Sequence, residues 1–110
     1  MSYDDELADR VREVVRGEPG MTEKRMFGGL AFLVNQRLAV SASSQGGLLL
    51  RVDPDETDDL VDGEQVSRFE MRGRPMDGWL HVHPDRVGTD ADLQSWVQRG
   101  VDYARSLTSG

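Results

Sequence analysis

The stretch TEKRMFGGLAFLVNQRLAV (Thr22–Val40) decides which fold this chain adopts. Leu30–Val34 is almost wholly apolar and ends at Asn35-Gln36, a pair typical of a hairpin turn. The next run, Leu38–Ser43, alternates between two sets of side chains, as a strand with two different faces does. The stretch therefore predicts neighbouring antiparallel strands joined by short connections.

Gly28 and Gly29 lie inside this stretch and allow two interpretations. A phosphate cradle would need backbone N–H groups that converge at a helix N-terminus. Here the glycines lead into a strand, and neither GxGxxG nor GxxxxGK[ST] follows. We favour a structural turn between Phe27 and Leu30, where a positive φ or a close backbone approach requires glycine.

Three more segments have the pattern of strands. Lys24–Phe27 is short, Leu48–Val52 is rich in leucine, and Trp79–His83 is closed by Pro84. Together with the hairpin they predict a sheet of about five strands.

Amphipathic helices are expected near both ends of the chain. From Asp4 to Arg16 apolar residues recur at helical spacing, and Asp4 is a suitable N-cap. Asp90 is expected to cap the second helix. Its apolar stripe consists of Leu93, Trp96, Val97, Gly100, Ala104 and Leu107.

The segment DPDETDDLVDG (Asp53–Gly63) predicts a short acidic helix, with Asp53 as its cap and Pro54 at its first position. A loop is expected after it, through Phe69 and Met71 to RGRPMDG (Arg72–Gly78). The helices and most strands stand in separate blocks. This order predicts one two-layer α+β domain over residues 1–110, with an antiparallel sheet packed against the N- and C-terminal helices.

Composition narrows the classes of partner. The 110 residues carry a formal net charge of −7, which works against charge-driven binding to DNA or RNA. There is no cysteine for disulfides or thiolate metal sites. The first residues lack the pattern of a signal peptide, and no stretch has the length of a membrane span. We expect a cytoplasmic protein that binds neither nucleic acid nor membrane.

No catalytic signature is present. None of the serines lies in GxSxG or SxxK. His81 and His83 share one face of a strand and could chelate a metal, but neither HExxH nor a cysteine set completes a site. We favour two surface histidines, and we expect no catalytic residue, no cofactor and no metal.

Arginines gather near the expected loop. Arg68, Arg72 and Arg74 flank it, and Lys24-Arg25 is a basic pair that the fold could bring nearby. Guanidinium groups suit the capture of carboxylate or phosphate. The interpretation we favour is that they balance the acidic helix through exposed ion pairs.

Strand alternation predicts the content of the outer sheet face. If Leu48, Leu50 and Val52 face the helices, Leu49 and Arg51 face away. If Leu80 and Val82 point inward, then Trp79, His81 and His83 point outward together. These residues either form an exposed patch for a partner, or a terminal helix or the RGRPM loop covers them.

Four blocks of sequence carry a resemblance to a known family. They occur in the order KRMFGGLAFLVNQRLAVSAS (24–43), GLLLRVD (47–53), FEMRGRPMDGW (69–79) and LQSWVQRGVDYARSL (93–107). This order resembles the TfoX N-terminal domain family, associated with the TfoX/Sxy regulators of bacterial competence. The resemblance implies a compact α+β domain similar to secretion-chaperone-like folds, and it supplies no catalytic residues. In longer regulators a helical domain follows, so we expect a single-domain member.

These observations lead to one leading hypothesis and one alternative. The leading hypothesis is a non-enzymatic interaction or regulatory module that contacts a protein partner or a second copy. Its expected partner-binding residues are Trp79, Arg51, Arg72 and Arg74. The alternative is a domain that binds a small anionic ligand or a metal through His81, His83 and Arg51.

Overall fold

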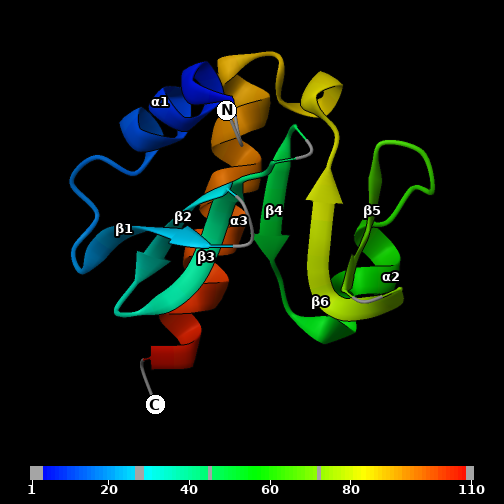
Figure 1. Ribbon diagram of the computed structural model, residues 1–110. Helices are drawn as coiled ribbons and strands as arrows, with labels where there is room; N and C mark the ends of the chain where they lie inside the picture. The colour runs from blue at the N-terminus through cyan, green and yellow to red at the C-terminus, as the bar shows by residue number, and fades with distance from the viewer. Residues whose placement is uncertain (1–3, 27–28, 45, 72, 109–110) are drawn as a thin grey trace.

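The structure, a computed structural model, describes residues 4–26, 29–44, 46–71 and 73–108. It is an α+β fold built on a six-stranded antiparallel sheet with strand order β1-β2-β3-β4-β6-β5 (Figure 1). The predicted fold class is confirmed. The strands are β1 (Met21–Met26), β2 (Gly29–Val34), β3 (Arg37–Ala42), β4 (Leu48–Arg51), β5 (Val66–Met71) and β6 (Arg74–Val82). The helical elements are α1 (Asp5–Val14), the 3-10 turn η1 (Pro54–Glu56), α2 (Thr57–Leu60), the 3-10 turn η2 (Pro84–Val87) and α3 (Asp90–Thr108).

Both terminal helices form where the sequence predicts them. Asp4 caps α1, because its Oδ1 accepts hydrogen bonds from the backbone N–H of Glu6 at 2.9 Å and of Leu7 at 3.2 Å. The expectation that Asp90 caps α3 is wrong. Thr89 does so, with its Oγ1 accepting from the N–H of Asp92 at 3.1 Å.

The first two hairpins follow from local geometry. Asn35 and Gln36 have φ angles of 50° and 73°, the left-handed backbone of a tight hairpin turn between Val34 and Arg37. Met26 pairs with Gly29, so β1 and β2 form the preceding hairpin. A Cβ on Gly29 would lie 2.1 Å from the carbonyl oxygen of Ala42, so this close approach needs glycine. Gly28 lies outside the described residues.

The expected loop before Trp79 is wrong, because most of it is strand. β5 pairs with both ends of the nine-residue β6, and Trp79 lies between these two paired stretches, where it pairs with Arg51 of β4 instead. Two features interrupt the alternation of side chains that would identify these strands in the sequence. The register shifts between Arg68 and Glu70, and Gly78 has a φ of 86°. Such bulges re-aim side chains within a strand, and so break the alternation by which strands are recognised.

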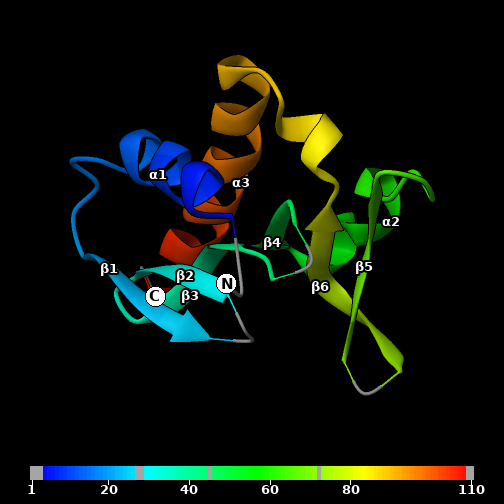
Figure 2. The same cartoon turned by 45° about the horizontal axis from the view of Figure 1, so that its top comes forward.

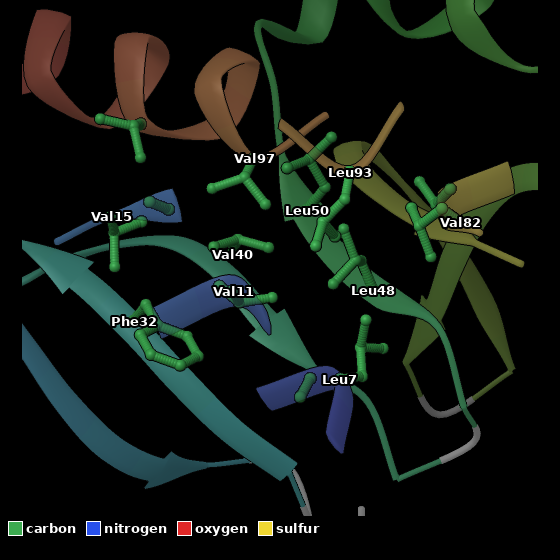
Figure 3. Close-up of a cluster of buried hydrophobic side chains, with 14 of the residues drawn as sticks. Leu7, Val11, Val15, Phe32, Val40, Leu48, Leu50, Val82, Leu93 and Val97 are labelled. Atoms are coloured by element: carbon green, nitrogen blue, oxygen red, sulfur yellow. The ribbon is translucent and has the colours of Figure 1, made fainter. Parts of the chain in front are cut away.

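The main core fills the space between the sheet and the helices (Figure 3). Figure 2 shows α1 and α3 lying over the same side of β2 and β3. Leu48, Leu50 and Val52 face this core, as the alternation predicts. α3 lies close to β3, because a Cβ on Gly100 would be only 2.4 Å from the carbonyl oxygen of Ala39. None of the described helices combines the length and the apolar character that crossing a membrane requires.

A second apolar cluster lies on the opposite face of the sheet. It contains Ala31, Leu33, Leu38 and Leu49, all buried, and partly buried side chains that pack against them: Met26, Phe69 and Trp79. Every described member belongs to a strand, and none of them comes from α1, from α3 or from residues 73–76. We call this face, opposite α1 and α3, the outer face.

Candidate interaction surface

The strand register aligns the outer face in rows across the sheet. Lys24 pairs with Ala31, Ala31 with Ser41, Ser41 with Leu49, and Leu49 with His81. Because neighbours across strands point to the same side, these side chains share the outer face.

The centre of the outer face is a small core with a partly buried apolar rim. Leu49 is 2% exposed and Leu33 is 8% exposed, although no described helix covers them. The rim consists of Met26 from β1, Phe69 from β5 and Trp79 from β6, each partly buried. A rim of large apolar side chains that keep contact with water is a feature of surfaces that bind partners.

The charges on the outer face of β1–β4 are positive. Glu23 is the one acidic residue in these four strands, and it turns to the helix side. There its carboxylate accepts hydrogen bonds from the Arg12 guanidinium of α1 at 2.7 and 2.9 Å. The hydrogen bond from Arg12 lowers the pKa of the Glu23 carboxyl. Lys24 and Arg51 remain as the charged residues of β1–β4 on the outer face.

Arg51 has an unusual environment for an arginine of this protein. It is the last residue of β4, it is half-buried, and it pairs with Trp79 across the sheet. Its guanidinium carbon lies 5.1 Å from the centroid of the Trp79 ring and 6.0 Å from that of Tyr103 in α3. Arg51 lies one residue beyond the last described β3–β4 pair, Val40 and Leu50, and its guanidinium lies at this end of β4 between the outer-face ring of Trp79 and the ring of Tyr103 on the helix side.

Arg51 forms no ion pair with another described residue. By contrast, seven arginines within the described ranges pair with carboxylates: Arg10, Arg12, Arg16, Arg68, Arg86, Arg99 and Arg105. Contact with two aromatic rings stabilises a guanidinium without neutralising its charge. Arg51 is therefore a half-buried cation whose charge is not balanced by a described carboxylate.

The structure separates the other predicted basic residues from Arg51. Arg74 is exposed at the start of β6, paired with Met71, at the end of the strand away from His81. Arg72 lies outside the described residues. Arg68 pairs with Asp58 of α2 and with Asp77, so its predicted role in balancing the acidic helix is confirmed.

Lys24 and Arg25 do not act as one basic pair. They are adjacent in β1, so their side chains point to opposite sides of the sheet. Lys24 shares the outer face with Met26, whereas Arg25 shares the helix side with Glu23.

The two histidines contact different backbone groups. The Nε2 of His81 lies 2.7 Å from the carbonyl oxygen of Gly46. His83 caps η2, with its Nδ1 accepting from the N–H of Asp85 at 3.1 Å. Across the described ranges, no three His, Cys, Asp or Glu side chains come together as a set that could hold a metal ion.

A groove of about 570 Å³ lies between α3 and η1, next to Arg51. Its carboxylates are already engaged by neighbours. Glu56 pairs with Arg99 at 3.6 Å, and Asp102 accepts from the side-chain amide of Gln98 at 2.9 Å. Tyr103 lines the groove and also contacts Arg51. Sequence patterns did not single out Tyr103, because it lies beside the apolar stripe of α3.

A comparison with protein families matches residues 13–104 to the TfoX N-terminal domain. This match runs from the last two residues of α1 into α3 and so includes every described strand. Comparison with curated proteins and comparison with solved structures each found no match. Because the matched residues make up most of the 110-residue chain, the protein belongs to the TfoX N-terminal domain family.

Proposed function

We propose that this protein is a non-enzymatic interaction module with a regulatory role, and that its outer face binds a protein partner around Trp79 and Arg51. The observation that carries this proposal is the half-buried Arg51, stacked on Trp79 without a carboxylate partner in the described structure. Tryptophan and arginine are the residues most enriched among those that dominate binding energy at protein interfaces.

The surroundings of this pair support the proposal. The apolar rim of Met26 and Phe69 lies on the same face, and the residues beneath it are tightly packed. An apolar centre with polar groups around it is the usual arrangement of an interface. The chain also belongs to a family that is not a known enzyme family.

The alternative role, binding of a small anion or a metal, has less support. Arg51 has the charge for an anion, but His81 and His83 already contact backbone groups of the loop at Gly46 and of η2. A site that used all three residues would have to break both of these contacts. We therefore place Arg51 in the protein-binding surface.

The experiment is an affinity capture from the native host with matched tryptophan variants. Trp79→Ala removes the outer-face ring, and Trp96→Ala removes a comparable ring on α3. The centroid of the Trp96 ring lies 5.9 Å from the guanidinium carbon of Arg86 and 5.9 Å from that of Arg99. Both tryptophans are partly buried, so each variant is first checked for cooperative unfolding. We expect Trp79→Ala to lose a captured protein that the wild-type chain and Trp96→Ala retain.

Arg51→Gln gives a second variant that does not depend on the packing of a large ring. We expect it to weaken the same captured complex. If both outer-face variants capture the same proteins as the wild-type chain, or if the wild-type chain captures none, the proposed function is wrong.

A further inference from the structure

We infer that the partner segment bound at the outer face is acidic and amphipathic. Its carboxylates pair with Arg51 and Lys24, and its apolar side chains contact the rim formed by Met26, Phe69 and Trp79. This inference rests on the proposed function and adds the chemistry of the partner.

The first argument is charge complementarity. The chain has a net charge of −7, yet β1–β4 present only Lys24 and Arg51 as charges on the outer face. Glu70 of β5 lines a small hollow with Ser67, Phe69 and His81 at the opposite edge of the sheet. A local positive region on an acidic protein favours acidic partners and repels basic ones.

The second argument is the geometry of Arg51. The rings of Trp79 and Tyr103 contact its guanidinium carbon, and no described carboxylate pairs with it. A planar guanidinium binds a carboxylate through two parallel N–H···O hydrogen bonds. Because Arg51 is half-buried, such a pair is less screened by water than an exposed ion pair is. An incoming carboxylate therefore finds a positioned cation beside an apolar surface.

The third argument concerns a second copy of the chain as the occupant. A symmetric dimer through the outer face would bring Lys24 and Arg51 from both copies into one interface, and β1–β4 offer no carboxylate on that face to oppose them. A copy that offered its acidic segment, Asp53–Glu64, would make a head-to-tail contact that need not close. Charge therefore favours a segment of a different protein.

The test uses two synthetic peptides of equal length and the 15N-labelled protein. In one peptide Glu alternates with Leu, and in the other Lys replaces every Glu. We expect the acidic peptide to shift the amide signals of Leu33, Leu49 and Arg51 and the indole signal of Trp79, and to bind more weakly as salt is added. We expect no shifts at these positions with the basic peptide.

Charge-reversal variants at neighbouring positions supply the matched control. Lys24→Glu and Arg25→Glu change the net charge equally on the same edge strand, but on opposite faces. We expect Lys24→Glu and Arg51→Gln to lower the affinity for the acidic peptide about fivefold to tenfold. Arg25→Glu is expected to change it by no more than about twofold, as distant surface charges do.

Each other outcome overturns the inference. Equal binding of the two peptides, no binding of the acidic peptide, or equal effects of Lys24→Glu and Arg25→Glu would do so. Self-association that grows with concentration and is lost in Trp79→Ala would assign the face to a second copy instead. If host capture depends on Trp79 but not on Lys24, the face binds a non-acidic partner, and the proposed function survives while this inference fails.

Discussion

Replacing Gly100 by alanine distinguishes helix propensity from tertiary packing. In an isolated helix this change stabilises by about 1 kcal/mol, because glycine loses more backbone entropy on folding than alanine does. In this fold the added Cβ would lie 2.4 Å from the carbonyl oxygen of Ala39 and 2.6 Å from Cδ1 of Leu50. A clash with backbone oxygen cannot be relieved by a side-chain rotation, so α3 must move away from β3.

The expected magnitude follows from these opposing terms. Overpacking of a well-packed core costs about 1–3 kcal/mol, and movement of α3 also disturbs Val97 and Ala104, which are fully buried. After the gain in propensity of about 1 kcal/mol we expect a net loss of up to roughly 2 kcal/mol, equivalent to a fall of up to about 10 °C in the melting temperature.

The assay is urea and thermal unfolding followed by circular dichroism. Ser95→Ala, at an exposed position of the same helix, is the control and should change stability by no more than about 0.5 kcal/mol. A Gly100→Ala variant that unfolds at higher urea concentration than the wild-type chain would refute the close contact between α3 and β3.

Three further predictions concern the sheet. Leu49→Ala should destabilise by about 2–4 kcal/mol, because Leu49 is 2% exposed on the outer face; a loss below about 1 kcal/mol in urea titrations would show that the second cluster is loosely packed. Gln36→Gly should raise stability by roughly 0.5 kcal/mol. Gln36 has a left-handed φ of 73°, and the strain that glycine relieves there is larger than the backbone entropy that glycine loses on folding. A lower melting temperature for Gln36→Gly than for the wild-type chain would contradict the turn geometry. The Glu23 carboxylate should stabilise the fold at neutral pH and lose this effect as the pH falls through its lowered folded-state pKa. The melting temperatures of the wild-type chain and of Glu23→Gln should therefore converge in acid. A difference in melting temperature that does not depend on pH would contradict the pair with Arg12.

Much of the fold can be predicted from local sequence because the signals are themselves local. Asp4 and the apolar spacing after it specify α1, and Asn35-Gln36 specifies the β2–β3 hairpin. β5 could not be recognised in this way. Its pairing with β6 contains a register shift, and Gly78 bends β6, so neither strand keeps a period of two.

The candidate surface is only partly predictable, for a different physical reason. Side chains alternate between the two faces of a strand, so Arg51 lies on the face opposite Leu50, and Trp79 lies on the face opposite Leu80. Both are therefore predicted on the same face if Leu50 and Leu80 point into the core. The contact of Arg51 with Tyr103 depends on how α3 crosses the sheet, which no local pattern encodes. Arg74 was expected to share a partner-binding surface with Trp79, but it lies five positions earlier in β6, a distance of up to about 16 Å along an extended strand.

Photo-crosslinking from the two sides of β1 tests the central claim most directly. A benzophenone amino acid is placed in the host at Thr22, whose side chain lies on the outer face, or at Arg25, on the helix side; both are exposed. The account predicts a covalent adduct with a partner protein from position 22 that disappears when Trp79→Ala is added, and little or no adduct from position 25. Adducts from position 25 without any from position 22 would contradict the assignment of the outer face as the contact surface.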